Sequence, residues 1–333
     1  MSKVGVIGGG AFGTAMACVA RRAGHAVTLW AREPEVIEAL NRQRENVVFL
    51  PGVPVPEGIV ATGELEPAVR GMDFVLAAVP AQHQRRVAAA FAPFVTPGLP
   101  VVNCAKGVER ESCALMPQVL VEALHGAVIA MLSGPSFARE VALDLPCGVT
   151  LACAERQVGE QLCQGLGSGR FRAYHSHDVI GTAVAGTVKN VVSIASGIVA
   201  GRQLGESARA TLVTRGLAEA TRLGLAMGAE EDTFLGLAGV GDLMLTAHSP
   251  HSRNTSLGVA IGEGHRAADV LAARRQVTEG ALSAESVARL ARRHRVEMPI
   301  VGMVDAILNH DAEPDAALLA LARHPYHDEL EAG

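Results

Sequence analysis

The stretch Lys3-Val4-Gly5-Val6-Ile7-Gly8-Gly9-Gly10-Ala11-Phe12-Gly13, at the start of the chain, decides the fold. A short apolar run ends at Gly8, and a glycine-x-glycine-x-x-glycine pattern then opens an alanine-rich segment with helical spacing. In dinucleotide-binding folds the first glycine allows a tight turn, the second a close approach of the backbone to a pyrophosphate, and the third close packing of helix on strand. We therefore predict a Rossmann-type fold with a dinucleotide at this helix N-terminus; the alternative is a glycine-rich turn without a ligand.

The end of the second expected strand, residues 26–30, bears on the type of dinucleotide. An acidic residue about 20 positions after the glycines would bind the ribose 2′-hydroxyl of NAD. Here Arg32 comes first, and Glu33 is expected to begin the next helix. Because a guanidinium suits a 2′-phosphate, the sequence favours NADPH, with NADH possible. The alternative for Arg32 is a solvated surface arginine.

The rest of the chain divides into two patterns. Short apolar runs at 59–61, 74–79, 100–103, 128–132 and 148–152 alternate with helical segments, which indicates a mostly parallel sheet. From about Asp178 the spacing is helical, over 178–200, 206–226, 252–262, 281–294 and 299–309. We predict an α/β protein with a Rossmann-type dinucleotide-binding domain at 1–177 and a second, all-helical substrate domain at 178–333.

The composition excludes several classes of protein. The 333 residues are 49% hydrophobic and carry a net charge of −5 without a basic run, which argues against disorder and against a nucleic-acid partner. None of the six cysteines forms a CxxC pair, as expected for reduced thiols in the cytoplasm. The first strand leaves no room for a signal peptide, and the longest apolar region, 179–200, is interrupted by Lys189 and Asn190. We therefore expect a cytoplasmic protein without a membrane span.

Lysine is rare in this chain, and its positions are informative. The 29 basic residues include only three lysines, Lys3, Lys106 and Lys189. Arginine cannot give up its proton in a protein, whereas lysine can act as an acid or a base. Lys106 follows the apolar run 100–103, and Lys189 shares its helix face mainly with small residues that leave room for a ligand. We predict chemical roles for Lys106 and Lys189; the alternative is a chance result of arginine-rich coding.

Three further segments combine glycines with polar side chains. Ser252-Arg253-Asn254 precedes a helical segment, and a hydroxyl, a guanidinium and helix N–H groups together suit a phosphate. Residues 133–140 have a similar composition, with Ser136 in the position of a helix cap. Residues 236–242 form a glycine-rich turn that ends in Asp242. Plain helix capping is the alternative for the two serine segments.

These motifs, taken in order, resemble one family: bacterial NAD(P)-dependent glycerol-3-phosphate dehydrogenase. The matching stretches are 6–14, 105–107, 133–140, 188–190, 236–246, 252–254 and 277–280. The resemblance implies reduction of dihydroxyacetone phosphate to sn-glycerol 3-phosphate for phospholipid synthesis, and it suggests a homodimer. Two positions depart from the family pattern. Ala11 stands where a serine is frequent, and Cys147 stands where a small residue or threonine is usual.

The resemblance also implies roles for single residues. Lys189 is the expected proton acceptor/donor, and we expect Lys106, Asp242 and Asn190 to assist it. The expected substrate positions are Lys106, Gly134, Ser136, Lys189, Asp242, Ser252, Arg253 and Asn254. The expected cofactor positions are Gly8, Gly10, Ala11, Phe12, Gly13, Arg32, Lys106, Ala138, Arg253, Val277 and Glu279. We predict no metal, because lysines supply the electrophile.

Three other interpretations of the sequence stay open at this point. A β-hydroxyacid dehydrogenase or a ketopantoate-type reductase would share the architecture and the lysine, although the phosphate-type cluster 252–254 argues against a non-phosphorylated acid. A non-catalytic NADPH sensor would be expected to lack the polar residues. A metal protein would have to use His248 with His251, or His324 with His327, and neither pair has a third ligand at a matching interval.

Overall fold

The computed structural model describes residues 1–274 and 277–323. Its contacts divide the chain into two compact units. The first unit comprises Met1–Ala105 and Met116–Val179, and the second comprises Lys106–Leu115 and the chain from Ile180 onward. The sequence patterns gave no sign that residues 106–115 leave the first unit. The cofactor and substrate roles of the two units remain predictions.

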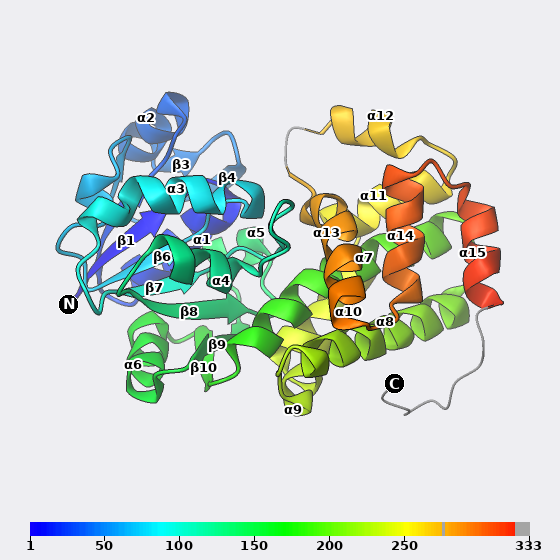
Figure 1. Cartoon of the computed structure of the whole chain (residues 1–333). Helices are drawn as coiled ribbons and strands as arrows, with labels where there is room; N and C mark the ends of the chain where they lie inside the picture. Colours follow the sequence, from blue (N-terminus) through cyan, green and yellow to red (C-terminus); the bar gives the residue numbers. More distant parts are fainter. Residues whose placement is uncertain (275–276, 324–333) are drawn as a thin grey trace. The chain divides into compact units, whose positions relative to one another are not determined.

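The first unit is built on an eight-stranded sheet in the order β10-β9-β8-β7-β6-β1-β2-β5 (Figure 1). All neighbouring strands pair in parallel except β8 and β9, so the sheet is mostly parallel, as predicted. The strands are β1 (Lys3–Ile7), β2 (Ala26–Trp30), β5 (Ile59–Thr62), β6 (Phe74–Ala77), β7 (Pro100–Asn103), β8 (Val128–Ser133), β9 (Cys147–Cys153) and β10 (Phe171–Ser176). A separate hairpin joins β3 (Glu45–Asn46) and β4 (Leu50–Pro54).

Helices cover both faces of this sheet, because its central strands are apolar on both sides. In β1, Val4 and Val6 belong to one hydrophobic cluster and Ile7 to another. The first cluster includes side chains of α1 (Ala11–Arg22), α2 (Pro34–Gln43), α5 (Ala138–Ala142) and α6 (Arg156–Leu166). The second includes side chains of α3 (Gln84–Phe91) and α4 (Met116–Ala123). Near-continuous apolar runs are typical of parallel strands buried on both faces.

Strands β3, β4 and β10 were not predicted from the sequence, and each is either very short or only partly buried. Strand β10 occupies an edge of the sheet, and only Phe171 among its six residues is fully buried. Its sequence, Phe-Arg-Ala-Tyr-His-Ser, therefore lacks the apolar run that marks the central strands. Strand β3 has two residues, which is too few for any periodicity.

The second unit is helical, as predicted, in the part of the chain that the structure describes. The predicted segments correspond to α7 (Val179–Gly201), α8 (Glu206–Ala226), α11 (Arg253–Gly262), α13 (Glu279–His294) and α14 (Pro299–Asn309). Four further helices were missed because each is short: α9 (Glu231–Leu235), α10 (Asp242–His248), α12 (Ala267–Ala272) and α15 (Pro314–Ala322). A five-residue π-helical turn, Leu237–Gly241, precedes α10.

Helix α7 forms the core of the second unit. By length and composition it could cross a membrane, with an 18-residue window of mean hydropathy 1.5. However, 94% of that window is buried within the protein, and Lys189 and Asn190 lie in its middle. Burial of this kind is typical of a core helix, which is hydrophobic all round.

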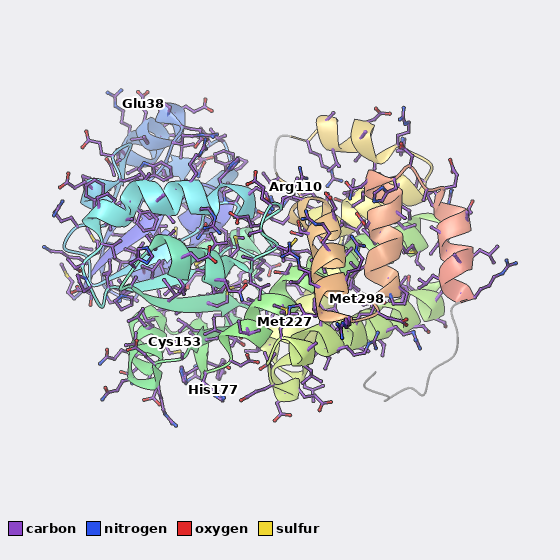
Figure 2. All side chains as sticks on the ribbon, viewed as in Figure 1. Glu38, Arg110, Cys153, His177, Met227 and Met298 are labelled. Atoms are coloured by element: carbon purple, nitrogen blue, oxygen red, sulfur yellow. The ribbon has the colours of Figure 1, made fainter. Side chains whose placement is uncertain are left out.

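A buried carboxylate of α8 binds the N-terminal N–H groups of helix α14. Glu219 accepts hydrogen bonds from the N–H groups of Ile300 (2.7 Å) and Val301 (3.2 Å), which lie in the first turn of α14. Met227 at the end of α8 and Met298 at the start of α14 are labelled in Figure 2. Burial raises the pKa of Glu219 to about 7, against the lowering effect of the two N–H groups.

Two helices of the second unit approach each other through glycines. A Cβ at Gly258 in α11 would lie 2.0 Å from the carbonyl oxygen of Ile194 in α7, and one at Gly197 would lie 2.2 Å from that of Thr255. We expect Gly258→Ala to lower the free energy of unfolding by about 1–3 kcal/mol, because overpacking would push the two helices apart. Thermal unfolding measures this effect.

Gly302 in α14 offers a matched control for Gly258. It is an exposed helical glycine whose added Cβ would meet no atom within 4 Å. We therefore expect Gly302→Ala to stabilise the protein by about 0.5–1 kcal/mol, the ordinary difference in helix propensity. If Gly258→Ala and Gly302→Ala shifted the unfolding temperature in the same direction, the close approach of α7 and α11 would not be the cause of the change in stability at Gly258.

Candidate active site

The glycine-rich turn after β1 has the geometry that a dinucleotide requires. Gly8 has φ +125°, and a Cβ there would lie 2.6 Å from the carbonyl oxygen of Ala78. A Cβ at Gly13 would lie 1.8 Å from the carbonyl oxygen of Gly8, so only glycine lets α1 pack this closely. At Gly10, which caps α1 without a side-chain bond, an added Cβ would meet nothing within 4 Å. The helix N-terminus thus faces open space over Gly10, and the residues fit a pyrophosphate.

Arg32 lies immediately after β2, and its guanidinium pairs with the neighbouring Glu33 carboxylate at 2.7 Å. The Arg32 side chain is 69% exposed, so this ion pair is solvated and weak. Glu33 is the N-cap residue of α2, which confirms that it starts that helix. Arg32 is therefore available to an anionic group.

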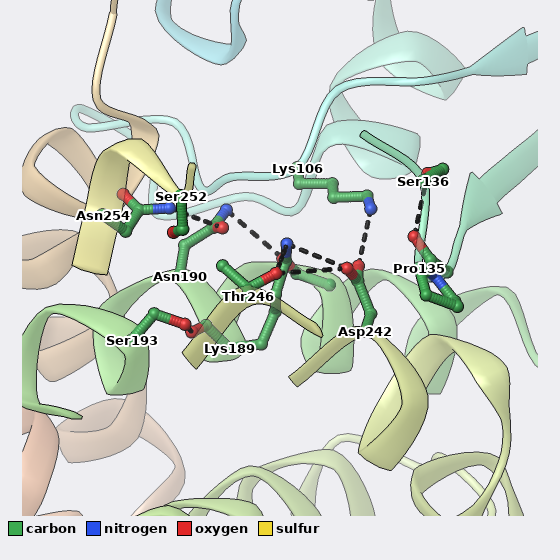
Figure 3. Close-up of polar contacts among 12 residues, drawn as sticks. Lys106, Pro135, Ser136, Lys189, Asn190, Ser193, Asp242, Thr246, Ser252 and Asn254 are labelled. Atoms are coloured by element: carbon green, nitrogen blue, oxygen red, sulfur yellow. Dashed lines mark hydrogen bonds and ion pairs between the residues drawn. The ribbon is translucent and has the colours of Figure 1, made fainter. Parts of the chain in front are cut away.

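A lysine–aspartate–lysine cluster lies within the second unit (Figure 3). Asp242 Oδ2 lies 2.6 Å from Lys106 Nζ, and Asp242 Oδ1 lies 3.0 Å from Lys189 Nζ. The exposed fractions of the three side chains are only 14% for Lys106, 10% for Lys189 and 2% for Asp242. The residues come from the 106–115 segment, from α7 and from the first turn of α10. The structure thus brings together three residues that lie far apart in the sequence.

The protonation states of the cluster follow from burial and charge. Burial lowers the pKa of Lys189 to about 8; Asp242 opposes this change, and Lys106 adds to it. Burial alone would raise the pKa of Asp242, but the two ammonium groups hold it below its ordinary value. Asp242 is therefore ionised near pH 7, and Lys189 can lose its proton within a range that is accessible to an enzyme.

Thr246 also belongs to this cluster, although no role was predicted for it. Its Oγ1 accepts a hydrogen bond from Lys189 Nζ at 2.7 Å and lies 3.4 Å from Asp242 Oδ1. Thr246 and Asp242 are four residues apart in α10, so both side chains lie on one helix face. The available signal was this spacing, but the glycines before Asp242 predicted a turn and not a helix.

The Ser252–Asn254 segment lies at the start of α11, and one of its side chains caps this helix. Ser252 Oγ accepts from Thr255 N at 3.2 Å, so Ser252 caps α11 while its hydroxyl proton can still be donated. Asn254 Nδ2 donates to Asn190 Oδ1 at 2.9 Å (Figure 3). Asn254 Oδ1 accepts from Gly280 N at 3.1 Å. Asn190 is thereby oriented, and its Nδ2 donates a long hydrogen bond of 3.4 Å to Gly186 O.

Arg253 and the start of α13 lie next to this segment. Arg253 Nη1 donates to the carbonyl oxygen of Val277 at 2.7 Å. Glu279 is the first residue of α13, and Arg253 and Glu279 attract each other. The structure therefore places three of the predicted cofactor positions, Arg253, Val277 and Glu279, side by side in the second unit.

The segment after β8 departs from the expectation for Ser136. Phe137 and not Ser136 is the N-cap residue of α5, and Ser136 Oγ instead donates to Gly134 O at 2.9 Å. The prediction of Ser136 as a helix cap is wrong, because α5 starts at Ala138, one residue later than that role requires. Gly134 has φ +139°, and its Cβ would lie 2.9 Å from Val149 Cα, so this position requires glycine.

The sequence contains two histidine pairs with ligand-like spacing, His248 with His251 and His324 with His327. Over residues 1–274 and 277–323, no three or more His, Cys, Asp or Glu side chains are grouped so that they could hold a metal ion. The pair His324 and His327 lies outside the described residues.

A Rossmann-type unit with a dinucleotide turn, followed by a helical unit with a buried lysine–carboxylate cluster, defines the class of two-domain nicotinamide-dependent oxidoreductases. The model of the N-terminus of NAD-dependent glycerol-3-phosphate dehydrogenase matches residues 3–159, and that of its C-terminus matches residues 178–319. The chain belongs to the NAD-dependent glycerol-3-phosphate dehydrogenase family.

Individual relatives agree with this family over the whole chain. A glycerol-3-phosphate dehydrogenase (NAD(P)+) of Parvibaculum lavamentivorans is 51% identical over 327 residues, which is 98% of each chain. The crystal structure of a glycerol-3-phosphate dehydrogenase from Coxiella burnetii is 36% identical, with a TM-score of 0.92 over 97% of this chain and 99% of that one. A ketopantoate reductase from Ralstonia eutropha shares only the fold, at 17% identity and a TM-score of 0.62 over 95% of this chain and 99% of that one.

Proposed function

We propose that this enzyme reduces dihydroxyacetone phosphate to sn-glycerol 3-phosphate, reversibly, and so supplies glycerophospholipid synthesis. The observation that carries the proposal is the buried Lys106–Asp242–Lys189 cluster, which offers a dissociable proton beside a fixed carboxylate. The nicotinamide, when bound, supplies the hydride for the carbonyl carbon.

Lys189 supplies the proton in this proposal. As negative charge grows on the carbonyl oxygen, the Lys189 ammonium stabilises it and transfers a proton, which leaves the alcohol. Asp242 and Thr246 orient the Lys189 Nζ with contacts of 3.0 and 2.7 Å. Lys106 adds a second positive charge, and Asn190, oriented by Asn254, has an amide N–H that can donate to a substrate oxygen.

The substrate phosphate is assigned to the start of α11. Arg253 supplies a guanidinium, Ser252 a hydroxyl proton, and α11 its first N–H groups. Gly134 and Ser136 are further proposed substrate positions, and Ala138 is a proposed cofactor position. The first unit holds the pyrophosphate over Gly8–Gly13, with Ala11 and Phe12 at the start of α1.

The pKa of Lys189 predicts the pH dependence of both directions of the reaction. Below a pKa of about 8 Lys189 carries the proton that reduction needs, and above it Lys189 is ready to accept the proton that oxidation releases. The kcat/KM of reduction should therefore fall as the pH rises through about 8, and that of oxidation should rise over the same range. Initial rates between pH 7 and about pH 10 test this sign, since the substrate phosphate, with a pKa of about 6, is already a dianion there. Parallel pH profiles for the two directions would contradict it.

Arg32 is proposed to favour NADPH over NADH by binding the 2′-phosphate. A charge-assisted bond of about 1.5–3 kcal/mol corresponds to a factor of roughly 10–100 in affinity. We expect Arg32→Ala to raise the KM for NADPH by this factor and to leave the KM for NADH nearly unchanged. Glu33→Gln is the matched control: it releases Arg32 from its ion pair, so the KM for NADPH should not rise. Equal increases for both cofactors in Arg32→Ala would exclude the 2′-phosphate role.

The proposed substrate is tested with a panel of carbonyl compounds at a fixed NADPH concentration. Loss of nicotinamide absorbance with dihydroxyacetone phosphate, and much slower loss with unphosphorylated dihydroxyacetone, would support the proposal. Faster turnover of ketopantoate or of a β-ketoacid would instead favour the related reductases.

The enzyme is further proposed to be a cytoplasmic homodimer. All six cysteines are free, as expected for a reducing compartment. Exposed apolar side chains on the helical unit, such as Leu204 and Met244, offer surface for a subunit contact.

A further inference from the structure

Helix α10 carries two members of the lysine cluster but is too short to hold itself in place. It has seven residues, Asp242–His248, with Asp242 and Thr246 on the face toward Lys189. Isolated helices shorter than about 12 residues are marginal in water, so its position must come from its neighbours.

The neighbours bind the carbonyl groups at the C-terminal end of α10. The carbonyl oxygen of Ala247 accepts from Arg209 Nη2 at 2.6 Å and from Ser196 Oγ at 2.9 Å. Arg209 Nε also donates to Ser196 Oγ at 2.9 Å, which closes a three-membered network. One residue earlier, the carbonyl oxygen of Thr246 accepts from Thr255 Oγ1 at 2.6 Å. Helices α8, α7 and α11 therefore all donate to the last turn of α10.

The network is buried and charged. Ser196 and Ala247 are fully buried, and the Arg209 side chain is only 13% exposed. Arg209 Nη1 also lies 3.7 Å from the carboxylate of Glu206, whose side chain is 83% exposed. A guanidinium at a helix C-terminus complements the partial negative charge of the last carbonyl groups. Its planar fork also fixes two acceptors at once, which a lysine ammonium cannot do in the same geometry.

We propose that Arg209, through Ser196 and the carbonyl group of Ala247, is a positioning residue that holds α10 in the register at which Asp242 and Thr246 reach Lys189. Ser196 lies seven residues after Lys189 on the same face of α7. The network thus links α7, which carries Lys189, to α10, which carries Asp242. This inference rests on the proposed function only for its kinetic consequence, because the contacts themselves do not depend on a substrate.

The charged groups around Lys189 give the expected direction of the effect. Burial has the largest effect on the pKa of Lys189 and lowers it. Among the charged groups, Asp242 from α10 raises this pKa, whereas Lys106 from the 106–115 segment and Arg253 from α11 lower it. When α10 loosens, the attraction of Asp242 weakens while the two cations remain. The Lys189 titration should therefore move to lower pH.

The scarcity of lysine makes this titration directly measurable. Labelling lysine with 13C at Cε gives signals from only Lys3, Lys106 and Lys189 in the native chain, and Lys189→Arg assigns the signal of Lys189. An Arg→Lys variant adds one further signal, which is recognised because the native spectrum lacks it. We expect a native midpoint of about 8 for Lys189. In Arg209→Lys and, separately, in Ser196→Ala, the midpoint should fall by about half a pH unit or more. The kcat should fall about tenfold, with little change in either KM.

Arg222→Lys is the matched control on the same helix, α8. Arg222 Nη2 donates to the carbonyl oxygen of Glu297 at 3.1 Å, away from α10. This variant should keep the native midpoint and kcat. A Lys189 midpoint unchanged in both Arg209→Lys and Ser196→Ala would overturn the positioning role. Absence of turnover in the native protein would instead remove the proposed function, because the titration is read without substrate.

Discussion

Lys189→Ala is expected to lower the kcat for reduction of dihydroxyacetone phosphate by about 10³-fold or more, since general acid catalysis and charge stabilisation are lost together. The fold should persist, because alanine suits a helix interior and Asp242 keeps its 2.6 Å contact with Lys106. Steady-state rates measure the loss, and fluorescence titration with NADPH should show nearly native affinity.

Two variants show whether the proton of Lys189 or only its charge is needed. Lys189→Arg keeps a positive charge that cannot dissociate, so it should also be nearly inactive. Lys3→Ala makes the same change at an exposed lysine at the start of β1 and should leave turnover unchanged. Substantial turnover in Lys189→Arg would mean that Lys189 acts only as a charge.

Asp242→Asn is expected to lower kcat by about 10²-fold and to destabilise the protein by about 3–5 kcal/mol, because two buried ammonium groups would lose their shared counter-charge. Without the carboxylate, the Lys106 charge would lower the pKa of Lys189 further, and less of the proton donor would be present at pH 7. Turnover, NADPH affinity and unfolding temperature together test this prediction.

The control for Asp242→Asn is a buried carboxylate outside the cluster. Asp305 in α14 is 5% exposed and accepts from Asn309 Nδ2 at 2.8 Å. Asp305→Asn should lower the unfolding temperature without a specific loss of kcat. If Asp242→Asn reduced NADPH binding and turnover to the same extent, Asp242 would have a structural role instead.

The sequence predicted those parts of the fold whose signals are local and long. The buried strands of the sheet and the five longest helices of the second unit each carry a continuous apolar run or a clear helical period. Edge strand β10 was missed because it lacks the apolar run of a strand buried on both faces, and the short helices α9 and α10 have too few residues to show a helical period. Residues 106–115 join the helical unit through contacts with residues distant in the chain, which no local pattern shows.

The same difference between local signals and long-range contacts applies to the candidate site. Lys106, Lys189 and Asp242 were identified as residues, but no pattern could show that one carboxylate lies within 3.0 Å of both ammonium groups. Thr246 was missed because the sequence predicted a glycine-rich turn ending in Asp242 and no helix after it, and the role of Ser136 as a helix cap was wrong by one residue. A glycine motif or a rare lysine is visible in a sequence. Contacts between side chains from different helices or strands become visible only in the folded structure.

The most direct test of the central claim is a 31P NMR measurement of dihydroxyacetone phosphate incubated with NADPH and either the native protein or Lys189→Ala. The account predicts that the native protein forms sn-glycerol 3-phosphate in proportion to the NADPH consumed, and that Lys189→Ala forms almost none although it binds NADPH. Equal product formation by the two proteins, or no product from native protein that binds NADPH, would contradict it.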